Sequence, residues 1–167
     1  MRRAAVRNAV MGSLILGACS DKPAPPAQPA APAPAAATGT IESATFAPAL
    51  GVDLAASTKA PSGLYYRDLV VGTGAVVADR QMLSMRYTGW LPDGTRFDGN
   101  EEGGAPLTFP LGVKAVIDGW DQGISGMRVG GQRQLIIPPA LGCGPAGNGP
   151  VPPNAIMVFK VEVLSAK

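Results

Sequence analysis

The sequence predicts an α+β domain in which a small antiparallel sheet wraps around one short helix. Several stretches in the second half of the 167-residue chain alternate between apolar and polar residues, as half-buried strands do. The turn sequence Pro92-Asp93-Gly94 joins two of them and favours a hairpin. One segment has apolar residues at helical spacing. A sheet and a helix with apolar faces are stable when they bury those faces against each other.

The expected strands follow one another along the chain from residue 64 onward. They span 64–71, 83–91, 95–98, 134–137 and 156–164, and the second and third flank the hairpin turn. In the last strand every second residue from 157 to 163 is apolar, whereas Lys160 and Glu162 lie between them. Because side chains alternate across a strand, we expect this strand to have one buried face and one solvated face.

The expected helix is short and contains several glycines. Its apolar residues occupy positions i, i+3, i+7 and i+10, and they are Ile117, Trp120, Ile124 and Met127. Three glycines lower its intrinsic helix propensity, and they are Gly119, Gly123 and Gly126. Since an isolated helix of this length is not stable in water, we expect it to pack on the concave face of the sheet.

Residues 1–18 have the features of an export signal peptide, because three Arg residues precede an apolar stretch from 9 to 18. This stretch is too short to span a bilayer. It ends in Leu16-Gly17-Ala18-Cys19, which resembles the bacterial lipobox. The resemblance implies cleavage before Cys19, acylation of its thiol and a durable membrane anchor. We therefore expect an exported protein that is lipid-anchored at the bacterial cell envelope, either facing the periplasm or, as Ser20 indicates, in the outer membrane.

Two further segments precede the folded domain, which we assign to residues 61–167. Residues 19–39 are an Ala/Pro-rich linker after the lipidated Cys19, and alternating prolines favour extended polyproline geometry. We favour the interpretation that the linker is a stalk that holds the domain away from a membrane, over the alternative that it is a docking motif for proline-binding domains. Residues 40–60 are interpreted as an N-terminal extension that covers part of the domain, because they contain apolar residues that could pack on it while Pro48 and Gly51 interrupt any long element.

The composition excludes several classes of function. The chain contains no His and two Cys, which excludes Ser-His-Asp and Cys-His nucleophiles and a Cys- or His-ligated zinc site. Three of the 14 Lys and Arg residues lie in the signal peptide, which leaves 11 against 12 Asp and Glu. Without a basic stripe, we expect no nucleic-acid binding. Most metal-dependent and hydrolase chemistry is thereby excluded.

The remaining polar residues form no convincing catalytic motif. A carboxylate pair for glycoside hydrolysis could include Asp98, but acidic residues on loops and at helix ends are usually solvated. Gly72-Thr73-Gly74 lacks the rest of a phosphate-binding fingerprint and is interpreted as a turn. Cys143 could be a weakly activated thiol, although a small packed side chain is the simpler interpretation.

A set of aromatic and aliphatic residues is the best candidate for a site. Its members come from different strands and from the helix, and they are Tyr87, Phe97, Phe109, Trp120 and Phe159 with Val116 and Ile117. Each of them alone is explained as a core residue. Together they are consistent with an aromatic pocket for an apolar ligand.

Five motifs in order resemble the FKBP family of peptidyl-prolyl cis-trans isomerases. They occupy 87–98, 116–123, 127–133, 137–142 and 151–155, and the likeness extends from about residue 61 to residue 167. The resemblance implies a curved antiparallel sheet around a short helix. It also implies rotation of X-Pro peptide bonds without cofactor, metal or covalent intermediate.

The resemblance also assigns roles to the matching residues. Trp120 corresponds to the floor of the pocket, and its aromatic walls are Tyr87, Phe97 and Phe159. Val116 and Ile117 correspond to the rim, where the N–H of Ile117 would hold a substrate carbonyl. Asp98 corresponds to a carboxylate that acts on the carbonyl of the twisting unit. The substrate-binding set further includes Val151 and Phe109, the latter in a more structural place near the wall.

Three features depart from the family pattern. Cys143 stands where most relatives have a Tyr whose hydroxyl bonds the substrate, and a thiol is a much weaker donor. Leu107, also assigned to substrate binding, occupies a position that is often aromatic. The loop from Gly144 to Pro150 is one residue shorter than usual.

Two functions from different classes follow from these observations. The first is an isomerase that assists the folding of exported proteins, and proline-containing proteins or peptides would be its substrates. The second is a chaperone module that captures proline-containing segments with little turnover. An apolar macrolide is a candidate inhibitor of either. A third interpretation is an adhesion or scaffold domain, but only the expected location at the cell surface supports it.

Overall fold

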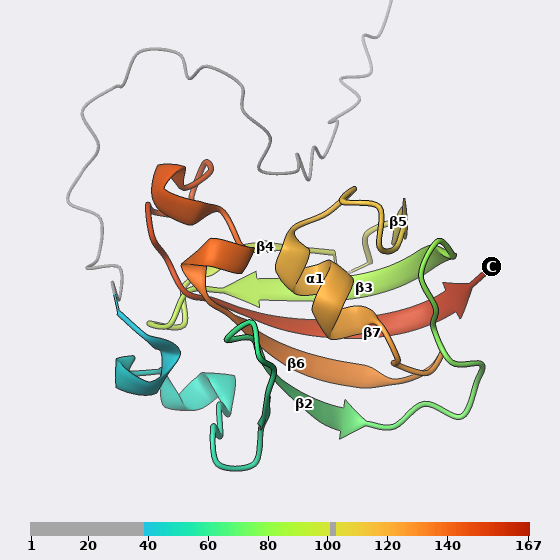
Figure 1. Cartoon of the computed structure of the whole chain (residues 1–167), viewed down its shortest axis with the longest axis horizontal. Helices are drawn as coiled ribbons and strands as arrows, with labels where there is room; N and C mark the ends of the chain where they lie inside the picture. Colours follow the sequence, from blue (N-terminus) through green and yellow to red (C-terminus); the bar gives the residue numbers. More distant parts are fainter. Residues whose placement is uncertain (1–38, 101–102) are drawn as a thin grey trace, which may run out of the picture.

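The computed structural model describes residues 39–100 and 103–167. The predicted signal peptide, Cys19 and all of the predicted linker except Gly39 lie outside the described residues. Figure 1 shows a curved sheet with one α-helix. The strands are β1 (Thr58–Lys59), β2 (Tyr65–Val70), β3 (Met82–Trp90), β4 (Arg96–Gly99), β5 (Leu107–Pro110), β6 (Gln132–Ile137) and β7 (Met157–Ala166). The helix is α1 (Asp118–Ile124), and four short 3₁₀ helices are η1 (Ile41–Ser43), η2 (Pro48–Leu50), η3 (Pro139–Leu141) and η4 (Gly144–Ala146).

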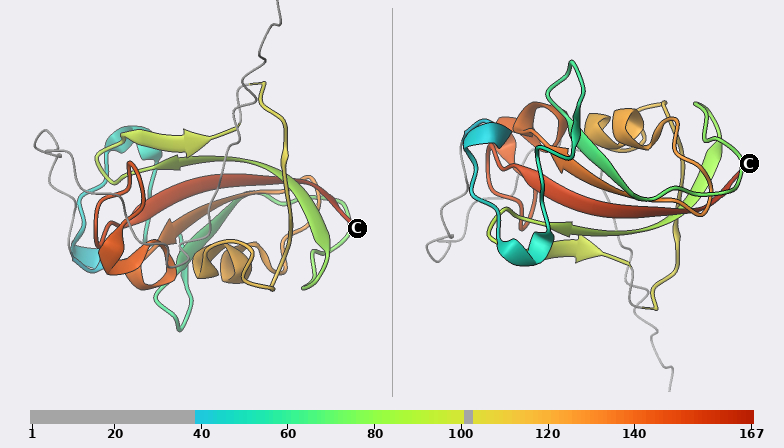
Figure 2. Two further views of the ribbon diagram at one scale, coloured as in Figure 1. Left: turned by 90° about the horizontal axis from the view of Figure 1, so that it is seen from above. Right: turned by 90° about the horizontal axis from the view of Figure 1, so that it is seen from below.

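The sheet is antiparallel throughout and has the strand order β1-β2-β6-β7-β3-β4. The long strands β3 and β7 lie in its middle, and β5 pairs with the first half of β3. The two views in Figure 2 show the sheet curving around α1, which lies on the concave face. The predicted fold class, an antiparallel sheet around one short helix, is confirmed.

The hairpin between β3 and β4 closes at the predicted turn. Leu91 N–H donates to the carbonyl of Thr95 at 2.9 Å, and Gly94 N–H donates to the carbonyl of Leu91 at the same distance. Gly94 has φ of +90°, a conformation that is readily available only to glycine. This turn places Phe97 and Asp98 of β4 beside the end of β3.

The glycines of the helix segment have different roles. A Cβ atom on Gly119 would lie 2.6 Å from Ile137, and one on Gly123 would lie 2.6 Å from Leu135. These two glycines therefore let α1 approach β6 closely. Gly126 has φ of +79°, and α1 ends at Ile124. The helix is therefore shorter than the apolar spacing up to Met127 predicts, although the Met127 side chain is buried in the core.

Both faces of the sheet are covered by apolar side chains. The concave face holds the main core against α1. The convex face has a second cluster of buried residues, namely Ile41, Tyr65, Ile136, Ile156 and Val158. Residues of the 40–60 extension pack on it, and they include Phe46, Leu50, Val52 and Leu54. Because Gln134 Nε2 also donates to the carbonyl of Leu50 at 2.7 Å, the extension is joined to the sheet by apolar and polar contacts.

Two strands were not expected from the sequence. β5 is four residues long and includes Pro110, so its alternation pattern is too short to recognise. β1 is two residues long and lies before residue 61, so the sheet begins within the segment assigned to the extension. In the described part of the chain, no helix has the length and apolar character needed to cross a membrane.

Candidate active site

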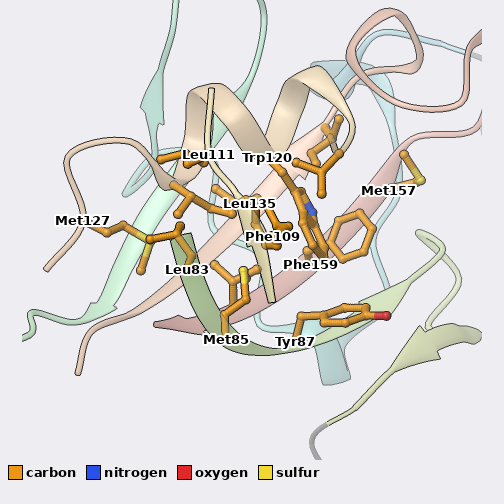
Figure 3. Close-up of a cluster of buried hydrophobic side chains, with 14 of the residues drawn as sticks. Leu83, Met85, Tyr87, Phe109, Leu111, Trp120, Met127, Leu135, Met157 and Phe159 are labelled. Atoms are coloured by element: carbon orange, nitrogen blue, oxygen red, sulfur yellow. The ribbon is translucent and has the colours of Figure 1, made fainter. Parts of the chain in front are cut away.

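Five aromatic side chains from five elements meet above the concave face of the sheet. Figure 3 shows four of them, Tyr87 of β3, Phe109 of β5, Trp120 of α1 and Phe159 of β7. The ring centroid of Trp120 lies 4.9 Å from that of Tyr87, 5.2 Å from that of Phe159 and 5.9 Å from that of Phe109. Phe97 of β4 contacts Phe159 edge-on at 5.5 Å. Edge-to-face packing is favourable for aromatic rings, and here it holds them around the central indole.

A glycine in β3 creates the space for two of these rings. Gly89 pairs with Phe159 in the β3–β7 register. A Cβ atom at position 89 would lie 2.6 Å from the ring of Phe159 and 2.8 Å from the ring of Phe97. The contact between these two rings therefore depends on the absence of a side chain at Gly89.

The cluster has a buried floor and a partly exposed rim. Trp120 is 0% exposed, Tyr87 is 1% exposed and Phe159 is 3% exposed. Phe97, Leu107, Ile117 and Cys143 are partly exposed and pack against this core. The indole Nε1 of Trp120 is buried and has no hydrogen-bond partner among the described residues. A ligand can therefore reach the indole only after the side chains at the rim have moved.

Tyr87 and Asp98 form the polar edge of the cluster. The hydroxyl of Tyr87 donates to Oδ2 of Asp98 at 3.0 Å, and Oδ1 of Asp98 accepts from the N–H of Gly99 at 2.8 Å. Burial raises the pKa of Tyr87 well above its usual value, and the negative charge of Asp98 and this hydrogen bond raise the pKa further. Tyr87 is therefore a neutral donor at physiological pH.

The start of α1 brings a backbone donor to the rim. Ile117 has extended backbone angles, and its carbonyl accepts from the N–H of Trp120 at 2.9 Å. The N–H of Ile117 has no hydrogen-bond partner within residues 39–100 and 103–167. Val116 is buried beside it. This part of the rim can thus donate one hydrogen bond to a ligand.

Another part of the rim is formed by the connection between β6 and β7. Cys143 lies between η3 and η4 and packs against the aromatic core. Val151 is buried in the same core, and its N–H and carbonyl both pair with Asn148 at 2.9 Å. The structure thus places every predicted site residue from 87 to 159 in or against one cluster, with Asp98 joined to it through Tyr87.

Two residues that shape the cluster were not singled out from the sequence. Gly89 carries a recognisable signal, because a glycine inside an alternating strand indicates a close approach by other atoms. Asn100 carries none, because a polar residue after a hairpin strand is ordinary in any loop. Within the described ranges, no three His, Cys, Asp or Glu side chains lie close enough together to hold a metal ion.

The comparisons with known proteins agree with this geometry. A family model described as FKBP-type peptidyl-prolyl cis-trans isomerase matches residues 74–164. The chain belongs to this family. An FK506-binding protein of Neisseria meningitidis serogroup B is 45% identical over 103 residues, which is 61% of this chain and 94% of that protein. An FKBP-type isomerase of Aeromonas hydrophila, FkpA, is 42% identical over 62% of this chain and 38% of its own length.

Solved FKBP structures have the same fold. The crystal structure of AtFKBP13 is similar with a TM-score of 0.63 and 38% identity, over 66% of this chain and 98% of that one. The crystal structure of FkpA from Escherichia coli has the same TM-score and identity, over 67% of this chain and 52% of that one. The predicted identity of the chain as an FKBP-type peptidyl-prolyl isomerase is confirmed.

Proposed function

We propose that this FKBP-type enzyme accelerates X-Pro rotation by enclosing the twisted amide in the aromatic cluster. The observation that carries this proposal is the position of Trp120. Its indole is fully buried at the bottom of a cluster whose rim residues are partly exposed. Once the side chains at the rim have moved aside, a prolyl ring seated on the indole would be surrounded by apolar side chains and separated from water.

The physical basis is the change in the amide during rotation. A planar amide is stabilised by resonance, and the barrier to rotation is about 18–20 kcal/mol. The twisted amide loses this conjugation and much of its dipole, so an apolar environment disfavours it less than the planar form. Each 1.36 kcal/mol of such preference increases the rate about tenfold. The reaction needs neither a nucleophile nor a proton transfer.

Two polar groups at the edge would orient the substrate. The unpartnered N–H of Ile117 is suited to hold the carbonyl of a residue that flanks the proline. Asp98 is suited to interact with the carbonyl of the rotating bond, and its hydrogen bond from Tyr87 keeps the carboxylate directed along the cluster. These assignments extend the roles that the family resemblance implies for the same positions.

The same pocket supports binding of FK506-type macrolides. The Neisseria relative is named an FK506-binding protein, and it is 45% identical to this chain over 103 residues. An apolar pocket with a few polar groups at its edge is the type of site that holds such ligands. We therefore expect a macrolide to compete with proline-containing substrates.

Cys143 supports a second candidate function, capture of proline-containing segments with slow turnover. It lies at the rim of the aromatic cluster, where a tyrosine hydroxyl would be a much better hydrogen-bond donor than a thiol. A substrate could then bind in the apolar pocket while one contact to the rotating unit is missing. The two functions are distinguished by measuring turnover and binding on the same sample.

The decisive experiment is prolyl cis-trans exchange on a tetrapeptide series with the purified chain and with Trp120→Ala. Trp90→Ala is the matched control, because Trp90 pairs with Val158 of the convex cluster, so its side chain lies on the opposite face of the sheet from the aromatic cluster. We expect acceleration that is lost in Trp120→Ala and retained in Trp90→Ala. Macrolide binding without acceleration by the wild-type chain would favour the capture function.

We further propose that the enzyme is an exported bacterial lipoprotein held at the cell envelope through Cys19. The proposal is supported by the apolar stretch from 9 to 18 and by the lipobox-like sequence that ends it. Residues 22–38 of the Ala/Pro-rich linker would then separate the catalytic domain from the membrane by up to about 50 Å, at about 3.1 Å per residue. Proline-containing segments of exported proteins would be its substrates.

Fractionation of cells that express the full chain tests this anchor. Cys19→Ser should move the protein from the membrane fraction to the soluble fraction and abolish incorporation of labelled fatty acid. Cys143→Ser is the control, because it removes the other cysteine of the chain and leaves the lipobox intact. Membrane association of Cys19→Ser equal to that of the wild type would refute the anchor.

A further inference from the structure

Asn100 is a buried polar residue next to the site that none of the assigned roles uses. It directly follows β4, which ends at Gly99, and it is only 9% exposed. A buried amide side chain is costly unless its donor and acceptor groups are satisfied. The partners of Asn100 therefore indicate what it does.

These partners lie on both sides of the site. Oδ1 of Asn100 accepts from the N–H of Tyr87 at 2.8 Å. Its Nδ2 donates to the carbonyl of Met85 at 3.3 Å and to the carbonyl of Ala105 at 3.1 Å. Its backbone N–H donates to the carbonyl of Tyr87 at 2.9 Å. Both backbone groups of Tyr87 are thus bonded to one residue.

The sheet topology explains why Tyr87 needs such a partner. On this side β3 pairs with β4 from Thr88 to Trp90 and with β5 from Met82 to Met85. Between these two pairings the described residues give β3 no partner strand on this side, and Tyr87 lies in this gap. Asn100 fills the gap with its backbone and its amide, so the hydrogen bonds of β3 continue where the partner strand changes.

We propose that Asn100 is a positioning residue for the isomerase reaction, acting through Tyr87. By fixing the backbone of Tyr87, it sets the ring against Trp120 and the hydroxyl against Asp98. Through its hydrogen bonds to the carbonyls of Met85 and Ala105, it also joins the end of β4 to β3 and to the segment that leads into β5. The inference rests on the proposed function of this same site.

The magnitude of the effect follows from geometry. Loss of the amide leaves the N–H of Tyr87 without its acceptor in a buried place, which favours a shift of β3 at this residue. Displacements of about 1 Å at a reacting group reduce rates by up to about 100-fold. For a residue that acts through another, we expect Asn100→Ala to lower kcat about tenfold and to leave KM within about twofold.

The experiment compares the wild-type chain with Asn100→Ala in two measurements. The first is prolyl exchange with kcat and KM determined separately. The second is the ring-current shift of the Tyr87 ring protons, which the indole of Trp120 produces at a centroid distance of 4.9 Å. We expect Asn100→Ala to lower kcat and to move the Tyr87 ring signals, while the signals of Phe159 stay in place.

Gln81→Ala is the matched control. Oε1 of Gln81 accepts from the N–H of Ala78 at 2.9 Å, so this variant also removes an amide acceptor from a backbone N–H. Gln81 directly precedes Met82, the first residue of β3. We therefore expect the kcat and the Tyr87 signals of Gln81→Ala to equal those of the wild type. Equal losses in Gln81→Ala and Asn100→Ala would assign the effect to general destabilisation and overturn the proposal.

Asn100→Asp provides a second variant if Asn100→Ala does not fold. It keeps the acceptor for the N–H of Tyr87 and loses the amide donors to Met85 and Ala105. Retained Tyr87 signals with kcat within about twofold of the wild type would support positioning through Tyr87. Retained signals with a tenfold lower kcat would overturn it. If the wild-type chain shows no turnover, the proposed function fails, and an unmoved Tyr87 ring in Asn100→Ala would refute the positioning role independently.

Discussion

The hydroxyl of Tyr87 donates a hydrogen bond to Oδ2 of Asp98 at 3.0 Å, from the middle of β3 to the second strand of the hairpin. The pair forms the polar edge of an otherwise apolar cluster. Burial of the phenol, together with the negative charge on Asp98, raises the pKa of Tyr87 above its ordinary value. The site is therefore arranged to keep this hydroxyl neutral and directed at the carboxylate.

The raised pKa of Tyr87 predicts a loss of stability in alkaline solution. A tyrosine whose pKa is higher in the folded state than in the unfolded chain contributes stability that is fully present below the unfolded value of about 10. This contribution is lost as the pH rises from there through the folded pKa. Tyr87→Phe should lower the free energy of unfolding by about 1 kcal/mol at pH 7 and show a smaller further loss above pH ~10. Urea denaturation across this pH range measures both effects, with Tyr66→Phe as the control.

The hydrogen bonds of Glu42 with Lys59 of β1 and Tyr65 of β2 predict an acid-dependent attachment of the start of the extension to the sheet. Lys59 Nζ and the Tyr65 hydroxyl both lie 2.6 Å from Oε1 of Glu42, and these hydrogen bonds lower the pKa of Glu42 to about 2. A lowered pKa contributes stability at pH above 4.5 that is lost as the pH falls toward about 2. Glu42→Gln should therefore reduce the acid-induced part of the stability loss.

Thermal denaturation monitored by circular dichroism between pH 7 and pH 2 checks this expectation. Lys59→Met removes the main partner of Glu42 and should reduce the same acid-dependent loss. An identical acid dependence in the wild type and in both variants would contradict a role for this contact in holding the extension.

Gly89→Ala should disturb the pocket by steric conflict. The new Cβ atom would lie within 3 Å of the rings of Phe97 and Phe159, so one of the rings must move. Overpacking of this kind destabilises a core by about 1–3 kcal/mol, and we expect a larger loss in macrolide affinity than in fold stability. Calorimetric titration and urea denaturation measure the two quantities. Ser84→Thr, which adds a methyl group on β3 outside the aromatic cluster, should leave the affinity unchanged.

Cys143→Tyr tests whether the thiol limits turnover. Cys143 is partly exposed at the rim and packs against the aromatic cluster. A phenol hydroxyl that bonds the substrate would add about 0.5–1.5 kcal/mol, which is about a two- to thirteenfold increase in kcat/KM. Cys143→Phe supplies the ring without the hydroxyl and should give no such increase. Equal rates in both variants and in the wild type would show that this position does not limit the reaction.

The period-two alternation, the hairpin turn and the motif spacing determined the fold class and the composition of the aromatic cluster. These patterns are local, because strand and helix periodicity and turn chemistry depend on residues close in the chain. They predicted the strands around Tyr87 and Phe159 and the short helix with Trp120. They also overextended that helix to Met127, because apolar spacing does not reveal that Gly126 adopts a positive φ.

The tertiary structure alone decided how closely these residues approach one another. The register of β3 against β7 places Gly89 beside Phe159, and the change of partner from β4 to β5 creates the gap that Asn100 fills. The packing of Phe46 and Leu50 on the convex face likewise depends on which side of the sheet the extension takes. In each of these contacts, strand register and sheet curvature set the distance between residues from different segments. Register and curvature cannot be recognised in the periodicity of a single segment.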